Sequence, residues 1–185
     1  MTPMIAASGF PPSGPLTAAD LGTMPDDGHG HELLDGSLIV TPVPAVPHQR
    51  AVGNLYLRLR EACSDDLEVM LTPLDIALSE ITVLQPDLLV APRDALEGEQ
   101  MVGLPVLAIE VLSPGTRLID LILKRAAFER AGVASYWAVD PDRPSITAWR
   151  LDGDEYVSDA SAKGDESFRT DAPFPIELRP EELVR

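Results

Sequence analysis

Two carboxylic acids stand inside apolar stretches of the sequence, where a charged side chain needs a specific reason to be. Asp87 lies in VLQPDLLVAP and Glu110 lies in LPVLAIEVLSP, and Lys124 follows in a stretch with helical spacing. Burying an isolated carboxylate costs several kcal/mol, so each acid is expected to be paired, hydrogen-bonded or bound to a metal ion. The three residues can form a reactive site. They can also form a structural ion pair between Glu110 and Lys124, with Asp87 capping a turn.

The segments around these residues indicate strands and a helix that would hold them. Strands are expected at about 67–78, 83–91 and 105–112, and the last two are apolar almost throughout, as in strands covered on both faces. A helix is expected over 117–131, with Gly132 placed to end it, and ASYWAVDP is typical of a further buried strand. A strand, a helix and a strand in this order favour a right-handed crossover and parallel pairing of the two strands.

Hairpin signals and an earlier helix complete the expected core. Asp35-Gly36 lies between apolar residues and predicts a hairpin, and Asp152-Gly153 gives a similar signal later in the chain. From His48 onward, apolar residues recur at close to helical spacing, which predicts an amphipathic helix.

The chain divides into an N-terminal arm and one domain. Residues 1–30 hold Pro, Gly and Ser in clusters and are expected to form a loosely ordered arm, in which Thr17 could cap a short helix. The domain is expected to cover residues 31–185, with an acidic C-terminal extension from about residue 152. A chain of 185 residues with 45% hydrophobic content can bury one good core.

Composition also limits location and chemistry. No stretch approaches the roughly 18 consecutive apolar residues of a membrane span, and the N-terminus lacks the basic region that opens a secretory signal. We therefore expect a cytoplasmic protein without a membrane partner. The single cysteine, Cys63, cannot form an internal disulfide, and we assign it no role.

The formal net charge of −16 argues against a protein that coats nucleic acid non-specifically, because such affinity comes largely from Lys and Arg. A local basic lining remains possible, because several basic residues fall on the two predicted helices. These are Arg50, Arg58, Arg60, Arg117, Lys124, Arg125 and Arg130.

The order of elements resembles a known nuclease fold. A helix, three strands, a helix and a strand, with acids in the second and third strands and a lysine in the following helix, resemble the PD-(D/E)XK superfamily, and more closely the bacterial Uma2 family (DUF820) of endonucleases. The resemblance covers about residues 32–150 and rests on HELLDGSL, PHQRAVGNL, TVLQPDLLV, AIEVLSPGTR, IDLILKRAAFERAGV and YWAVDP. It implies an α/β (α+β) fold, with a restriction-endonuclease-like core of a central mixed β-sheet flanked by helices, plus an N-terminal β-hairpin.

The resemblance also implies roles for individual residues. Pro86-Asp87 matches the PD of the superfamily pattern, and Glu110 matches its second acid. The sequence departs from the pattern two residues later, where Leu112 stands in place of the lysine. Lys124 matches family members whose lysine has moved to the following helix, from which a long side chain can reach the same site.

The implied activity is metal-dependent hydrolysis of phosphodiester bonds in nucleic acid, with DNA as the expected substrate. Asp87, Glu110 and the backbone carbonyl of Val111 would bind Mg²⁺ or Mn²⁺, which prefer oxygen ligands. Lys124 would orient the attacking water or stabilise the developing charge.

Three more residues are candidates for the site. Glu32 and His48, in HEL and PHQ, match recurrent family positions and could add a metal ligand or a proton-handling group. Asp120 lies one helical turn before Lys124 and could pair with it, either within the site or as a helix-surface partner.

Two alternatives of another kind stay open. The loop from Ser113 to Thr116 precedes a helix and suits a phosphate, but it suits a cap and turn equally well. The protein as a whole is expected to be a homodimer, so that two sites can address two strands. The alternative function is a catalytically inactive nuclease-fold module for binding or interaction, since the chain is acidic and no base-reading element is evident.

Overall fold

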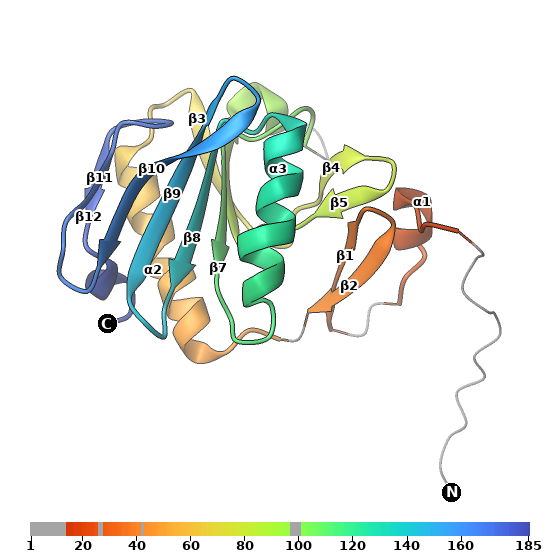
Figure 1. The fold of residues 1–185 in the computed structure, drawn as a ribbon, viewed down its shortest axis with the longest axis horizontal. Coiled ribbons are helices and arrows are strands. Elements are labelled where there is room, and N and C mark those ends of the chain that lie inside the picture. Colours follow the sequence, from red (N-terminus) through yellow and green to blue (C-terminus); the bar gives the residue numbers. More distant parts are fainter. Residues whose placement is uncertain (1–13, 26–27, 42, 97–100) are drawn as a thin grey trace, which may run out of the picture.

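A mixed six-stranded sheet forms the centre of the computed structural model, which describes residues 14–25, 28–41, 43–96 and 101–185 (Figure 1). Its strand order is β10-β9-β8-β7-β6-β3. The strands are β3 (Leu67–Leu71), β6 (Leu88–Pro92), β7 (Leu107–Val111), β8 (Ser135–Asp140), β9 (Ser145–Asp152) and β10 (Glu155–Lys163). The neighbours β7 and β8 run parallel, and the other described pairs of this sheet run antiparallel.

Two smaller sheets flank the central one. The four-stranded sheet has the order β2-β1-β5-β4 and contains β1 (Gly30–Leu34), β2 (Ser37–Thr41), β4 (Ile76–Ser79) and β5 (Thr82–Leu84). The two-stranded sheet pairs β11 (Phe168–Thr170) with β12 (Ile176–Leu178). The helical segments are α1 (Ala18–Leu21), α2 (Val46–Ala62), the 3₁₀ turn η1 (Arg93–Leu96), the π-helix η2 (Ile119–Lys124), α3 (Arg125–Ala131) and the 3₁₀ turn η3 (Pro180–Leu183).

Each face of the central sheet has its own apolar core, because side chains alternate along a strand. Leu88 and Val90 of β6 pack on the face covered by α2, whereas Leu89 and Ala91 pack on the face covered by α3. Figure 1 shows the two helices on opposite faces. The same alternation turns Glu110 away from the α2 core, to which Ile109 and Val111 belong.

The predicted parallel pairing of two strands joined by a helix is confirmed, and the right-handed crossover stays a prediction. β7 and β8 pair in parallel from Leu107 opposite Ser135 to Val111 opposite Val139, and η2 and α3 lie between them in the chain. The predicted helix over 117–131 therefore exists, but its first part is a π-helix. Gly132 ends it in the left-handed conformation, with φ 88°, as its position in the sequence predicts.

The predictions of continuous strands at 67–78 and 83–91 are wrong. The first is divided into β3 and β4, and the second into β5 and β6, with one half of each in the central sheet and the other half in the four-stranded sheet. Pro73 and Pro86 stand at the breaks, and proline has no N–H to donate to a strand ladder. As a consequence, Asp87 lies in the connection just before β6 and not within a strand.

Both predicted hairpins are confirmed. Asp35 and Gly36 join β1 to β2 with φ values of 49° and 77°, which places both residues in the left-handed region that a tight two-residue turn requires. The second hairpin joins β9 to β10, and its last pair is Asp152 opposite Glu155. Its turn residues are therefore Gly153 and Asp154.

The chain outside the predicted core also packs in a defined way. Thr17 caps α1 as predicted, in a capping box with Asp20, while residues 1–13 of the expected arm lie outside the described part of the chain. Phe168 and Leu183, in the acidic C-terminal part, belong to the same core as α2.

The domain boundary at residue 31 stays a prediction. Among the described residues, no helix is long and apolar enough to cross a membrane.

Candidate active site

Asp87 and Glu110 come together because β6 and β7 run antiparallel. Asp87 immediately precedes β6, and Glu110 is near the end of β7, so the two residues lie at the same end of these neighbouring strands. The backbone N–H of Val111 donates a hydrogen bond of 2.8 Å to Oδ2 of Asp87. This bond fixes the first acid beside the second.

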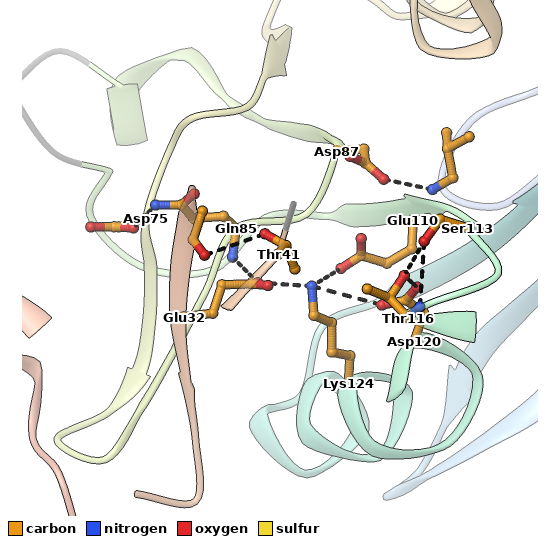
Figure 2. Close-up of polar contacts among 12 residues, drawn as sticks. Glu32, Thr41, Asp75, Gln85, Asp87, Glu110, Ser113, Thr116, Asp120 and Lys124 are labelled. Carbon is orange, nitrogen blue, oxygen red and sulfur yellow. Dashed lines mark hydrogen bonds and ion pairs between the residues drawn. The ribbon is translucent and has the colours of Figure 1, made fainter. Parts of the chain in front are cut away.

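Lys124 lies at the centre of a buried cluster of acids. Its Nζ is 3.0 Å from Oε1 of Glu110, 2.8 Å from Oε1 of Glu32 and 3.8 Å from Oδ1 of Asp120. Figure 2 shows the ammonium group between Glu32 on one side and Glu110 and Asp120 on the other. All four side chains are at most 4% exposed. Four of the six predicted catalytic residues, namely Glu32, Glu110, Asp120 and Lys124, therefore form one ion cluster.

Three separate parts of the fold contribute to this cluster. Glu32 comes from β1 of the four-stranded sheet, and its Oε1 also accepts a 2.7 Å hydrogen bond from the backbone N–H of Gln85. Glu110 comes from the central sheet. Asp120 and Lys124 come from the π-helix η2. The cluster is thus the point at which the two sheets and the crossover helix meet.

The π-helix is held in place by a tyrosine of the central sheet. The carbonyl of Asp120 accepts the backbone N–H of Arg125, five residues ahead, as well as a 2.8 Å hydrogen bond from the hydroxyl of Tyr136. Tyr136 is fully buried on β8. π-helical turns are rare and frequently occur at functional sites. Here the turn contains both residues that η2 contributes to the cluster.

His48 lies beside Asp87 and not beside Lys124. Its Nε2 is 3.2 Å from Oδ2 of Asp87, and it is buried in the first turn of α2. Among the described residues, no hydrogen-bond partner reaches its buried Nδ1. Burial lowers the pKa of His48, but the hydrogen bond to Asp87 and the charge of that carboxylate contribute to a net rise above its usual value.

Burial and mutual repulsion shift the pKa values of the cluster. Burial raises the pKa of Glu110 well above its usual value, although the charge of Lys124 acts in the opposite direction. Burial likewise raises the pKa of Asp120 to about 6, against the charge of Lys124 and the hydrogen bond from Thr116. Burial lowers the pKa of Lys124, but the surrounding carboxylates, Glu110 first, outweigh it and raise the pKa. The lysine is therefore firmly protonated.

The cluster lies in the wall of a cavity of about 770 Å³. Residues 113–116 also line it, and the Thr116 hydroxyl donates a 2.7 Å hydrogen bond to Oδ2 of Asp120. This loop therefore supports an acid of the cluster, and it is itself held by the bond from the Thr116 N–H to Oγ of Ser113. The predicted affinity of the loop 113–116 for phosphate stays a prediction.

The donor chemistry of the wall fits a hard divalent cation. Among the described residues, six carboxylates line the cavity with one lysine, so negative charge is in excess, and four of them are the predicted site residues Glu32, Asp87, Glu110 and Asp120. Oδ1 of Asp87 and Oε2 of Glu110 accept no hydrogen bond from the described residues. In the same part of the chain, no group of three or more His, Cys, Asp or Glu side chains is arranged to hold a metal ion. The predicted metal ligands, which are the carboxylates of Asp87 and Glu110 and the backbone carbonyl of Val111, stay a prediction.

Sequence reasoning missed three partners of the cluster. Gln85 fixes Glu32 through its backbone, Tyr136 fixes the π-helix, and the Thr116 side chain fixes Asp120. A backbone donor such as that of Gln85 leaves no sequence signal. Tyr136 offers a weak one, because a buried tyrosine hydroxyl in an apolar strand needs a hydrogen-bond partner.

Comparison with known proteins identifies relatives of the whole fold. The chain matches the model of the Uma2 family, described as "Putative restriction endonuclease", over residues 18–181. The crystal structure of "a putative nuclease belonging to DUF820" from Anabaena variabilis ATCC 29413 is similar, with a TM-score of 0.75 and 16% sequence identity over 92% of this chain and 98% of that chain. No curated protein matches the chain.

These matches bear on the predicted fold and on the predicted family. The structural likeness confirms the expected mixed sheet flanked by helices, and at this level of identity it is evidence for the fold alone. The family match extends from α1 to η3 and includes all residues of the ion cluster. The chain therefore belongs to the Uma2 family, whose description is that of restriction endonucleases, enzymes that act on phosphodiester bonds.

Proposed function

We propose that this protein is a divalent-metal-dependent nuclease that hydrolyses phosphodiester bonds of nucleic acid, with DNA as the expected substrate. One observation carries the proposal: a buried lysine and an excess of buried carboxylates line the wall of a single cavity. Burying that much negative charge weakens the fold unless a cation offsets it. Such a cost is commonly retained at functional sites.

Asp87 and Glu110 would hold Mg²⁺ or Mn²⁺ through their free oxygens, with the carbonyl of Val111 and water as further ligands. When bound, the cation supplies a polarised phosphoryl oxygen and a water of lowered pKa. The oxygen of the attacking water forms the new bond to phosphorus, and one ester oxygen leaves with a proton. The chain holds the two acids ready for this task through the N–H of Val111.

Lys124 would place its ammonium group where negative charge develops on the phosphate. Glu32 and Asp120 would orient that ammonium, since both contact Nζ from opposite sides (Figure 2). His48 would act on Asp87, which it contacts, and not on the lysine. Because the lysine is delivered by a helix, the residue two positions after Glu110 is free to be the apolar Leu112, which is buried.

The alternative function is a catalytically inactive module, and one observation favours it. Lys124 already contacts three carboxylates, so the cluster can act as a structural joint without any reaction. A homodimer and a cytoplasmic location are further parts of the proposal. Sedimentation velocity of the purified protein tests the dimer.

The decisive experiment measures cleavage of plasmid and linear DNA with Mg²⁺, with Mn²⁺ and with EDTA. Asp87→Asn and Glu110→Gln are the test variants, because they keep the size of the side chain and remove its charge. Glu155→Gln, at an exposed position of β10, is the control for loss of one negative charge.

We expect metal-dependent cleavage by the wild type and by E155Q, and loss of at least about a hundredfold in kcat/KM in D87N and E110Q. Circular dichroism checks that all variants fold. Folded wild-type protein that binds metal without cleaving any nucleic acid would establish the inactive module. Cleavage that survives in D87N would exclude the proposed metal site.

A further inference from the structure

The cavity wall has a chemistry that is unusual for an enzyme acting on duplex DNA. Six acids line it, namely Glu32, Asp75, Asp87, Glu110, Asp120 and Asp142, whereas Lys124 is the one lysine or arginine among the described lining residues. Six prolines also line it, including Pro44, Pro47, Pro114 and Pro141. The wall is therefore acidic and apolar, and its one lysine, Lys124, is at the centre of the ion cluster.

The basic residue that follows the cavity-lining loop 113–116 is already paired with an acid. Arg117 follows the lining loop 113–116, and its guanidinium donates a 2.6 Å hydrogen bond to Oδ2 of the buried Asp140. Farther away, half of the other basic side chains form ion pairs with acids. Besides Arg117 and Lys124, these are Arg58, Arg93, Arg130, Arg150, Arg169 and Arg185. Among the described residues, the basic side chains without an ion pair do not line the cavity; these are Arg50, Arg60, Arg125, Arg143, Lys163 and Arg179.

Duplex binding depends on a track of free cations. A protein on duplex DNA neutralises several phosphates with Lys and Arg, and specific interfaces bury about 1,000–2,500 Å² of strongly positive surface. A formal net charge of −16, with most arginines paired, supplies little of this attraction. Lys124 and the proposed metal ion would offset the charge of the reacting phosphate. No comparable cation among the described residues of the cavity wall would offset the charge of the flanking phosphates of a duplex.

The size and lining of the cavity suit a smaller part of a nucleic acid. Cavities of about 300–1,000 Å³ hold ligands of drug size, which is the scale of one or two nucleotides. The volume of about 770 Å³ lies within that range. The imidazoles of His29 and His31 supply aromatic rings on which an unstacked base can stack, and the prolines supply apolar contacts. A base within a duplex is stacked and cannot enter.

We propose that the substrate enters this site as an unpaired strand, with one or two nucleotides inside the cavity and one phosphate at the ion cluster. The proposal rests on the nuclease function proposed above and names the substrate class of that same site.

The proposal predicts how the affinity for the substrate depends on salt concentration. Affinity for single strands falls with a log–log slope of about −0.7 for each phosphate neutralised, so the slope here is about −0.7, whereas a duplex enzyme with six phosphate contacts gives about −5.

The first test compares three substrates of one sequence, each of about 12 nucleotides: a single strand, a blunt duplex, and a duplex with an unpaired overhang. We expect the single strand and the overhang to be cleaved with kcat/KM at least about tenfold above that of the blunt duplex. Equal or faster cleavage of the blunt duplex overturns the inference and leaves the nuclease function intact. No metal-dependent cleavage of any substrate by folded protein overturns both.

The second test alters the wall. Asp142 is exposed at the cavity, and Asp154 is exposed in the β9–β10 turn, away from it. Dissociation constants for the labelled single strand are measured by fluorescence anisotropy, with Ca²⁺ at fixed concentration and KCl varied from about 50 to 200 mM. We expect Asp142→Lys to make the slope steeper by about 0.7 and Asp154→Lys to leave it unchanged. A wild-type slope steeper than about −3, or equal effects of the two variants, overturns the inference.

Discussion

Burial makes the negative charge of Asp120 costly within the ion cluster. Its folded-state pKa of about 6 is raised from the usual 3.8 by burial first, while Lys124 and Thr116 act in the opposite direction. A carboxylate with a raised pKa binds its proton more tightly in the folded state than in the unfolded state. It therefore favours folding below about pH 4, and that contribution is lost as the pH rises through about 6.

This sign gives a prediction for Asp120→Asn in metal-free protein. We expect the free energy of unfolding of the wild type, relative to D120N, to fall by roughly 3 kcal/mol between about pH 4 and pH 7. Urea denaturation in EDTA at several pH values measures the difference. Asp154→Asn removes one exposed charge and serves as control. If the difference in free energy of unfolding between the wild type and D120N did not change with pH, the raised pKa of Asp120 would be contradicted.

Individual site residues could be predicted, but their neighbours could not. Asp87, Glu110 and Lys124 stand out because charge is costly in apolar segments, and the structure places all three in the wall of one cavity. Their exact partners depend on distances between segments far apart in the chain. Gln85, for example, contributes a backbone N–H, and every residue except proline has one.

At the scale of elements, the π-helix η2 is the part that sequence patterns did not reveal. Apolar spacing predicts a helix over 117–131 but does not distinguish a wider turn, which depends on tertiary partners such as Tyr136. The strand predictions failed for a similar reason. Each of the apolar segments 67–78 and 83–91 contributes one strand to the central sheet and one to the four-stranded sheet. In the sequence, only the prolines within these segments mark the breaks.

We predict that Tyr136→Phe lowers catalysis by changing the position of η2. The variant removes the hydrogen bond from the hydroxyl to the Asp120 carbonyl, which still accepts the Arg125 N–H. Tyr156→Phe is a matched control, because its hydroxyl donates a bond of the same 2.8 Å length to the carbonyl of Val133, outside the site.

Both tyrosine variants should lose about 0.5–1.5 kcal/mol of stability, as for a typical hydrogen bond. Only Y136F should also lower kcat, by about tenfold, with KM little changed, since Lys124 would be less well placed. Thermal denaturation and steady-state kinetics separate the two effects. Equal kcat values in Y136F and Y156F would show that the tyrosine has a structural role alone.

At the scale of the whole molecule, the excess of buried negative charge predicts that divalent metal ions stabilise the protein. Binding to the folded state alone contributes about 2.7 kcal/mol when the ion is at a hundred times its Kd. We expect Mg²⁺ and Mn²⁺ to raise the Tm of the wild type and of E155Q relative to EDTA. The increase should be largely lost in D87N and E110Q. An equal increase in all four proteins would indicate binding to the acidic surface.

The meeting of two sheets at Lys124 has a consequence for how this chain can change over generations. Glu32 belongs to the four-stranded sheet and Glu110 to the central one, and the lysine contacts both. A substitution of Lys124 that abolishes the reaction by removing its charge also loosens the contact between the sheets, because the buried carboxylates that have lost their partner are strongly destabilising. Selection for a folded protein and selection for a working catalyst therefore act on the same few side chains.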